Sequence, residues 1–452
     1  MKTRVALCMA AFAASAASHA ATIDKVVVRQ QWPWSTDVKV EYRLTGVTAP
    51  VDVSVAAYDG DTPLDSAKID AATKGDVYGV SADGDYSIMI DPVAAFGADH
   101  AAIPNFNVEL TLSDSAANTT EVLYKIIDLD AFTVEDVTRA DFMNGKMGAY
   151  ETDFGAIGAN YWTALQDVLI WTGVTNVPAY KTSKLVMRKV PAKNVTYCMG
   201  NNPGNKGTSG CSGSAMVTLT NDFYLSVFEV TEGQYKRMTA VNGVLGESPS
   251  SKGDDYPVTS LSYNALRGDP AKWTGWPENQ YAVASDTTIA KFRANMPGYL
   301  FDLPTEAQWE YACRAGTTND TYTGIRVTSA ANLDALSKQV GWVRGETNTL
   351  MVGGLKKPNA LGFYDMLGNA AEHCRDLIAS TSTSDSYDPP ALSGEVTEPY
   401  GMSEGTAANH SINRRGGSYN SSASAYNVCQ FRRLNHKRST GSGTFRLWMR
   451  AE

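Results

Sequence analysis

The stretch LPTEAQWEYACRAGT, residues 303–317, carries the sequence signals of a capped helix. The Thr305 hydroxyl can accept a hydrogen bond from the backbone N–H three residues on, and Gln308 can reach back to the N–H of Thr305, which together make a capping box. Gly316 follows the last helical residue and can adopt the left-handed conformation that ends many helices. The earlier stretch TEGQYKRM, residues 231–238, has the same capping pattern. We therefore predict a short helix in each stretch.

Two more stretches follow the first in order. They are KKPNALGFYDMLGNAAEH at residues 356–373 and RRGGSYN…FRR…TFR spread over residues 414–446. In this order and spacing the three stretches resemble the formylglycine-generating enzyme family, also called the sulfatase-modifying factors. The resemblance covers well over half of the chain, and we assign residues 184–452 to this domain. It implies a loop-rich α+β fold that is a variant of the C-type lectin fold.

The resemblance implies a calcium ion at the loop-to-strand turn DMLGNAAE, residues 365–372. It assigns ligand roles to the side chains of Asp365 and Glu372 and to the backbone carbonyls of Gly368 and Ala370. Two carboxylates with carbonyl oxygens suit a hard cation that accepts six to eight oxygen ligands. The alternative is that the two carboxylates only hydrogen-bond neighbouring backbone.

A second calcium site of the family corresponds to Asn332 and the carbonyl of Leu333, although its remaining ligands have no counterpart in this sequence. The chain also departs from the family beside the first site. The tryptophans that flank the family's glutamate are replaced by Ala371 and His373. Local packing there is therefore expected to differ.

Active members of the family oxidise a cysteine of a client sulfatase with a copper(I) ion held by two cysteines just after the Gly-Gly-Ser motif. Those two positions fall on Ser421 and Tyr426 in this sequence. Copper(I) requires soft thiolate ligands, whereas a serine hydroxyl is a hard oxygen and a tyrosine ionises only near pH 10. Ser418 of the motif remains. We therefore expect no copper and a pocket without its redox metal.

Three hypotheses for function follow from this pattern. The first is a non-catalytic extracellular binding protein, a pseudoenzyme whose face meets a protein, peptide or glycan, because serine, asparagine and tyrosine are favoured at adaptable recognition surfaces. The second is an oxidase with a rearranged site that uses Cys429, with or without Cys374. The third is a structural envelope protein without a specific ligand. The predicted ligand-binding residues of the first hypothesis are Ser418, Asn420, Ser421, Tyr426, Arg432 and Arg433.

The residues before this domain have the sequence pattern of a second, separate domain. Five segments alternate apolar and polar residues with the two-residue period of strands, at 38–44, 51–57, 86–90, 105–112 and 121–127. Turn-forming residues separate them. We predict an immunoglobulin-like β-sandwich over residues 21–130, by architecture only, followed by a linker over residues 131–183.

The first twenty residues, MKTRVALCMAAFAASAASHA, have a basic start, an apolar stretch and a small-residue end. That pattern is typical of a cleaved secretory signal peptide, so residues 1–20 predict a secreted or periplasmic protein. No later run is apolar for long enough to span a membrane. The net charge of −9 argues against a general nucleic-acid binder, which needs a cationic face.

Five cysteines remain after the predicted signal peptide, so at least one is unpaired within the chain. Cys198 and Cys211 flank a loop rich in glycine and asparagine and could close it. The sequence leaves the pairing of all five open: Cys198, Cys211, Cys313, Cys374 and Cys429.

Overall fold

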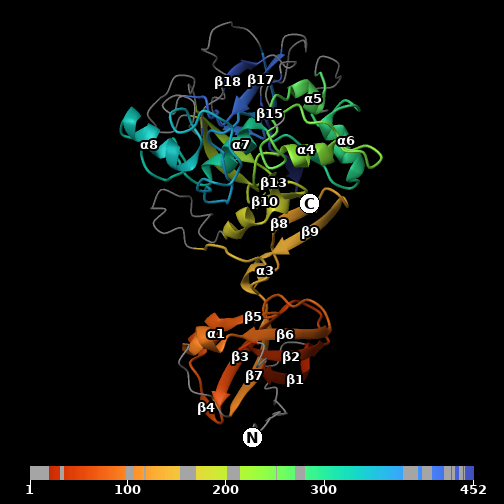
Figure 1. The fold of residues 1–452 in the computed structure, drawn as a ribbon, viewed down its shortest axis with the longest axis vertical. Coiled ribbons are helices and arrows are strands. Elements are labelled where there is room, and N and C mark those ends of the chain that lie inside the picture. Colours follow the sequence, from red (N-terminus) through yellow and green to blue (C-terminus); the bar gives the residue numbers. More distant parts are fainter. Residues whose placement is uncertain are drawn as a thin grey trace. The chain divides into compact units, whose positions relative to one another are not determined.

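The computed structural model of the protein describes most of the chain beyond its first residues. The described positions are 20–30, 35–97, 103, 105–116, 119–152, 169–200, 214–250, 252–269, 280–379, 395–399, 410–421, 429, 433–436, 441 and 443–451. The chain divides into two compact units, and Figure 1 labels the helices and strands. The first unit is Met1–Leu123 with Val137–Gly148, and the second is Tyr124–Asp136 with Ala149–Glu452.

The first unit is built mainly from two antiparallel sheets that share one apolar core. In β3 the alternate residues Val51, Val53, Val55 and Ala57 are buried, as the two-residue period predicts. One sheet has the order β1 (Thr22–Gln30), β2 (Val38–Thr45), β6 (Gly84–Ile90), β5 (Thr73–Gly75), and the other has the order β4 (Thr62–Pro63), β3 (Val51–Asp59), β7 (Phe106–Asp114). Three short helices are described in this unit, α1 (Ser66–Ala72), α2 (Pro92–Phe96) and α3 (Arg139–Met143).

The segment expected as the last strand of the sandwich lies elsewhere. Strand β8 (Val122–Asp128) pairs with β10 (Lys184–Val190) in the sheet of the second unit. Every residue from Leu123 to Ile127 is buried, because β8 is an inner strand with neighbours on both sides. Lys125 is buried within it and forms an ion pair of 2.6 Å with Asp136. The alternating sequence pattern predicts a strand with one buried face, whereas this strand is buried on both faces.

The expected linker also contains regular structure. Its described part forms strand β9 (Thr133–Thr138), helix α3 (Arg139–Met143) and the short 3₁₀ helices η2 (Thr172–Asn176) and η3 (Pro178–Lys181). Helix α3 begins with a capping box between Thr138 and Asp141. Aspartate replaces the glutamate or glutamine of the usual pattern, so this helix start was missed.

The second unit is α+β, as expected. Its largest sheet has the order β14 (Phe301–Asp302), β19 (Trp448–Arg450), β13 (Phe223–Ser226), β10, β8, β9. Two three-stranded sheets accompany it: β11 (Val195–Gly200), β12 (Ser214–Leu219), β16 (Glu395–Thr397); and β15 (Glu372–Ala379), β17 (His410–Arg415), β18 (Arg433–His436). The helices are α4 (Glu232–Met238), α5 (Tyr263–Arg267), α6 (Thr288–Asn295), α7 (Glu306–Arg314) and α8 (Ala330–Val340).

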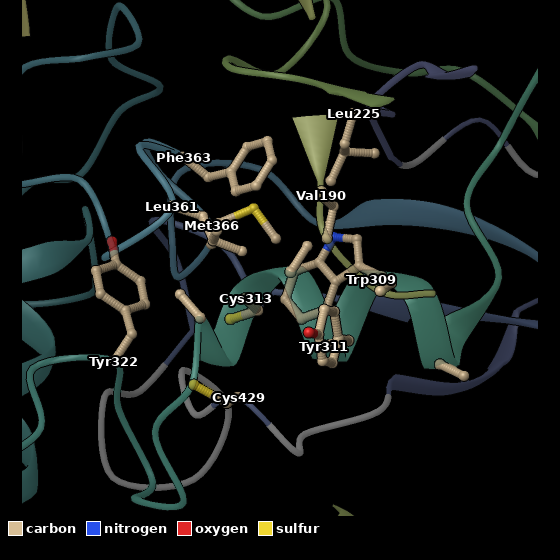
Figure 2. Packing of buried hydrophobic residues seen from close by; sticks show 14 of the residues in the cluster. Val190, Leu225, Trp309, Tyr311, Cys313, Tyr322, Leu361, Phe363, Met366 and Cys429 are labelled. Atoms are coloured by element: carbon tan, nitrogen blue, oxygen red, sulfur yellow. The ribbon is translucent and has the colours of Figure 1, made fainter. Parts of the chain in front are cut away.

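Both predicted capped helices are present. Helices α4 and α7 each begin with the predicted capping box, and the α7 helix ends at Ala315, which takes the left-handed conformation just before Gly316. Every residue of α7 is buried. Trp309 and Cys313 of this helix lie in the main apolar core of the unit, shown in Figure 2. Helix α7 thus lies in the interior of the second unit, with its side chains packed into the main core.

In the parts of the chain that the structure describes, no helix combines the length and the apolar character of a membrane span.

Candidate functional site

One carboxylate joins the three motif stretches. Glu372 begins β15 and is buried, with each carboxylate oxygen hydrogen-bonded. Its Oε2 accepts from the Trp309 indole Nε1 at 2.7 Å, and its Oε1 accepts from Arg446 Nε at 2.8 Å. Trp309, Glu372 and Arg446 come from the first, second and third stretches respectively. The spacing that carried the family resemblance therefore corresponds to a single buried centre.

Arg446 is the cation of this centre. Its guanidinium is fully buried and donates to the backbone carbonyls of Ser226, at 3.2 Å, Val227, at 2.8 Å, and Tyr364. Burial raises the pKa of Glu372, while the charge of Arg446 opposes that rise. The arginine thus neutralises the carboxylate and fixes the end of β13 to the predicted calcium turn.

The predicted calcium ligand Asp365 has an oxygen without a partner. Its Oδ2 accepts from the Gly354 N–H at 2.7 Å, whereas its buried Oδ1 has no hydrogen-bond partner among the described residues. The backbone of Asp365 is in the left-handed region, with φ of 53°. Burial raises the pKa of this carboxyl, and the Gly354 bond and Arg446 oppose the rise. A buried carboxylate oxygen without a partner is rare in folded proteins and marks a place where an ion or a water can bind.

The backbone of the turn fits the same role. Gly368 has φ of 84° and donates its N–H to the Gly416 carbonyl at 2.7 Å. Within the described part of the chain, no hydrogen bond is recorded to the carbonyl oxygen of Gly368 or of Ala370. Among the described residues, three of the four predicted ligand groups therefore have an oxygen without a hydrogen bond: Asp365 Oδ1 and the carbonyls of Gly368 and Ala370. The fourth, Glu372, already contacts Trp309 and Arg446, although a carboxylate oxygen can accept more than one bond.

A third buried carboxylate, Glu229, was not predicted from the sequence. It precedes α4, and its Oε1 accepts from the Ala370 N–H at 2.9 Å while its Oε2 accepts from the Asn369 amide at 2.6 Å. Burial raises its pKa well above the ordinary value, and the nearby charges of Glu372 and Asp365 raise it further. An acidic residue inside the apolar run FYLSVFEV was the available signal. Three carboxylates thus surround the turn, with Arg446 as their buried counter-charge.

The residues of the second predicted calcium site do not fit a metal. The Oδ1 of Asn332 accepts from the Thr328 N–H at 3.1 Å, so it serves the start of α8. Leu333 is in the first turns of the same helix, where carbonyl oxygens accept the helix's own N–H groups. Its side chain is buried in a small apolar cluster with Val327 and Leu336. Helix formation accounts for both residues.

The Gly-Gly-Ser segment forms a tight turn beside this centre. Gly416 has φ of 85°, and a Cβ atom there would lie 2.9 Å from the Met366 carbonyl oxygen. After the turn, the Oγ of Ser421 lies 3.1 Å from the Ser418 N–H and 3.0 Å from the Ser418 Oγ. Ser421 is buried, whereas Asn420 is exposed. Ser421, which matches the first copper-binding cysteine of the family, is thus a hydroxyl hydrogen-bonded to Ser418.

The structure brings together three of the six predicted binding residues. Ser418, Asn420 and Ser421 lie on one turn, and Asn420 Oδ1 accepts from the exposed Arg344 Nη2 at 3.3 Å. Arg433 begins β18 opposite Arg414 of β17. Tyr426 and Arg432 lie outside the described residues. Arg344 was not predicted, since it lies far from the motif in sequence.

Three of the cysteines that the structure describes are buried in the second unit: Cys313, Cys374 and Cys429. Cys313 and Cys429 both lie in the main apolar core, where Figure 2 labels their side chains. Burial is the largest cause of the raised pKa of Cys313 and of Cys374. Nearby charged side chains also act on the pKa of Cys374. Cys198 lies in β11, and Cys211 is outside the described residues, so the predicted bridge between those two stays a prediction.

The α+β unit, its buried carboxylate–arginine centre and its Gly-Gly-Ser turn define the class of sulfatase-modifying-factor domains. Residues 188–450 match the model of the sulfatase-modifying factor enzyme 1-like domain, and the chain belongs to that family. The match confirms the resemblance carried by the three stretches.

Individual relatives are more distant. The chain is 29% identical over 194 residues to the chaperone protein LppX of Paenibacillus barcinonensis, and the aligned part is 37% of this chain and 66% of that protein. The chain therefore spans just under two thirds of that relative's length. Among solved structures, the Treponema denticola variable protein 1 is 21% identical with a TM-score of 0.41, covering 59% of this chain and 96% of that chain. PvdO from Pseudomonas aeruginosa is 20% identical with a TM-score of 0.40, covering 59% and 94%.

Proposed function

We propose that this protein is a non-catalytic member of the family that binds a protein partner through the loops around its Gly-Gly-Ser turn. The observation that carries the proposal is the state of Ser421. At the first copper position the chain has a buried hydroxyl that is hydrogen-bonded to Ser418, where an active member needs a thiolate. A hard oxygen in this state does not hold copper(I). The chain keeps the fold of the family but has no thiolate at this position to hold the metal.

The chemistry of the turn supports a recognition role. Asn420 and Arg344 are exposed and contact each other, and both side chains can donate hydrogen bonds to a partner's backbone. The relative from Paenibacillus is named a chaperone, which favours a polypeptide over a glycan as the partner. Export by the signal peptide would place this binding outside the cytoplasm. We also propose that the first unit is immunoglobulin-like and that the second unit is a variant of the C-type lectin fold.

An aggregation assay tests this binding. The full-length mature protein is added to a chemically denatured model protein, and light scattering follows aggregation on dilution. We expect suppression at near-stoichiometric amounts. In a variant with both Asn420→Ala and Arg344→Ala, the amount needed is expected to rise about tenfold, because an interface depends on a few central residues and tenfold corresponds to about 1.4 kcal/mol.

The matched control carries Asn221→Ala and Arg326→Ala, an exposed asparagine and arginine on other loops of the same unit. It is expected to behave as the wild type. Equal loss in both double variants, or no suppression by the wild type, would contradict the proposed binding face.

We further propose that the turn at residues 365–372 binds calcium. The Oδ1 of Asp365, the carbonyls of Gly368 and Ala370 and the carboxylate of Glu372 would hold the ion, which would supply positive charge among the buried carboxylates. The unpartnered Oδ1 of Asp365 is the main support. The raised pKa of Asp365 also supports the proposal, because its ionisation in the buried site is unfavourable until a cation compensates it.

Calcium is expected to stabilise the wild type and not Asp365→Asn. At calcium about 100-fold above the dissociation constant the gain is about 2.7 kcal/mol, measured as a rise in melting temperature that a chelator reverses. Without calcium, the difference in stability between the wild type and Asp365→Asn is expected to disappear or reverse. A carboxyl whose folded-state pKa is raised destabilises the fold as pH rises through that pKa, so above it the neutral Asp365→Asn variant should be at least as stable as the wild type in chelator.

Asp334→Asn, which changes a half-buried carboxyl paired with Lys338, serves as the control and should respond to calcium as the wild type does. Identical melting of the wild type in calcium and in chelator would show that the turn binds no calcium.

An oxidase with a rearranged site is the second candidate, and one observation bears on it. Cys429 shares the main apolar core with Cys313 and Cys374, and all three side chains are fully buried. Copper(I) needs thiolates, and burial raises the pKa of Cys313 and so favours its thiol form. A structural envelope protein without a ligand is the remaining alternative, and it predicts no effect of the Asn420 and Arg344 changes.

A further inference from the structure

We propose that the second unit binds a small inorganic anion, such as chloride, in a buried site between Arg375 of β15 and Trp448 of β19. The site uses none of the residues assigned to the Gly-Gly-Ser turn or to the predicted calcium turn. The inference goes beyond the proposed partner binding and does not depend on it. Three buried nitrogen donors without acceptors carry it, two from Arg375 and one from Trp448.

Both side chains are almost fully buried, with Arg375 1% and Trp448 3% exposed. The Nε and Nη1 of Arg375 and the indole Nε1 of Trp448 have no hydrogen-bond partner among the described residues. The ion pair recorded for Arg375 is with Asp302, whose Oδ2 lies 3.9 Å from Nη1, beyond the reach of a hydrogen bond. Buried donors are seldom left in this state, because each has lost the hydrogen bonds that water supplied.

The two side chains lie together in an aromatic environment. The Arg375 guanidinium lies over the Tyr281 ring, 4.5 Å from its centroid, and over the Trp448 ring, 5.4 Å from its centroid. The two rings stack on each other with centroids 5.9 Å apart. Ring faces attract the guanidinium charge, but they do not replace the oxygen or halide acceptors that its N–H groups require.

Asp302 does not satisfy Arg375, because two other arginines already use both of its oxygens. Its Oδ1 accepts from the Leu303 N–H at 2.7 Å and is paired with Arg267 Nε at 2.7 Å. Its Oδ2 accepts from Arg267 Nη2 at 2.9 Å and from Arg293 Nη2 at 3.0 Å. Burial lowers the pKa of Arg293, Asp302 opposes this change, and the two neighbouring arginines lower the pKa further. Arg375 is thus a third cation beside one carboxylate.

The backbone keeps these donors in the interior. The Arg375 N–H donates to the Pro304 carbonyl at 2.8 Å, and the Arg375 carbonyl accepts from the Tyr263 hydroxyl at 2.9 Å. Trp448 is the cross-strand neighbour of Asp302 in the pairing of β14 with β19. Neither side chain can therefore turn to solvent without breaking strand contacts.

An anion fits this site better than a water molecule does. Guanidinium and indole nitrogens only donate, and an anion only accepts and also balances the buried positive charge. A water molecule would leave that charge uncompensated and would need acceptors for its own protons. Because both side chains are enclosed, the ligand is expected to be a small ion and not a group carried by a macromolecule.

The ion would link two sheets. Strand β15 belongs to the sheet that continues through β17 to the Gly-Gly-Ser turn, whereas β19 belongs to the largest sheet of the unit. A charge shared between Arg375 and Trp448 would therefore stabilise the packing of one sheet on the other.

Thermal unfolding at constant ionic strength tests the proposal. Chloride is exchanged for the larger anion gluconate, with calcium present throughout. We expect the melting temperature of the wild type to rise by about 5 °C at chloride about 100-fold above its dissociation constant, because the ion binds only the folded state. Trp448→Phe keeps a ring but removes the indole N–H, and it should need about tenfold more chloride for the same rise.

Two arginine variants identify the site. Arg375→Met should show no rise with chloride, whereas Arg450→Met should respond as the wild type does, since the exposed Arg450 lies over the same Tyr281 ring at 5.1 Å. If Arg375→Met does not fold, the wild type and Trp448→Phe still decide the question.

Crystals of the wild type grown with sodium bromide should give an anomalous peak in contact with Arg375 and Trp448. A melting temperature that is the same in chloride and in gluconate would overturn the proposal. A chloride response that persists unchanged in Arg375→Met, or a water molecule at the site in the bromide crystals, would overturn it as well.

Discussion

Replacing Arg446 by methionine is expected to destabilise the second unit by about 3–5 kcal/mol, the usual cost of removing one partner of a buried ion pair. Methionine fills similar space but leaves Glu372 without its cation, and the carbonyls of Ser226, Val227 and Tyr364 lose their donor. Glu229 and Asp365, also buried, add like charge nearby. Denaturant unfolding of the purified variant measures the loss.

Arg450→Met is the matched control, because Arg450 lies shortly after Arg446 in the chain, at the end of β19, and is exposed. Its change should stay within about 1 kcal/mol, since its main contact is a cation–π interaction with Tyr281. Similar stability of the Arg446→Met variant and the wild type would mean that the buried centre does not hold the three stretches together. A double change of Arg446→Met and Glu372→Met should recover part of the lost stability, because no buried charge is then left unpaired at that pair.

Gly368→Ala is expected to cost about 3 kcal/mol or more, from the left-handed backbone and from overpacking together. The glycine has φ of 84°, and an added Cβ would lie 2.3 Å from the Trp342 carbonyl oxygen and 2.8 Å from that residue's N and C atoms. These are backbone atoms, so no side-chain rotation relieves the clash. The variant should therefore also lose the calcium response proposed for the turn. Thermal unfolding with and without calcium gives both readings.

Gly353→Ala provides the comparison, since it is buried beside the same site and an added Cβ would be 3.6 Å from Asp365 Oδ2 and from Phe228. That spacing is ordinary contact, and the change should be within about 1 kcal/mol. Equal effects of the two substitutions would contradict the strained geometry assigned to Gly368.

Local signals in the sequence were enough to predict part of the fold. The capping boxes at Thr231 and Thr305 depend on side chains only three residues apart, and the structure confirms both helices. The order of the three stretches predicted the family, because Trp309, Glu372 and Arg446 interact directly and their types are therefore constrained together.

What the sequence did not reveal depends on contacts between distant segments. The place of β8 is set by pairing with β10, which no local pattern shows. Glu229 belongs to the centre only because the turn folds back onto it, and its nearest motif partner, Asn369, is far along the chain. The presence of Cys313 and Cys429 in one apolar core is of the same kind. A single sequence gives residue types at such positions but not their neighbours.

Formylglycine formation on a cysteine-containing sulfatase peptide, followed by mass spectrometry with and without added copper, tests most directly whether the domain is non-catalytic. An active family member assayed in parallel shows that the conditions support turnover. For this protein we expect no aldehyde product under either condition, because Ser421 and Tyr426 replace the two thiols that the metal requires. Copper-dependent product that disappears in the Cys429→Ser variant would contradict that expectation and identify the protein as an oxidase with a rearranged site.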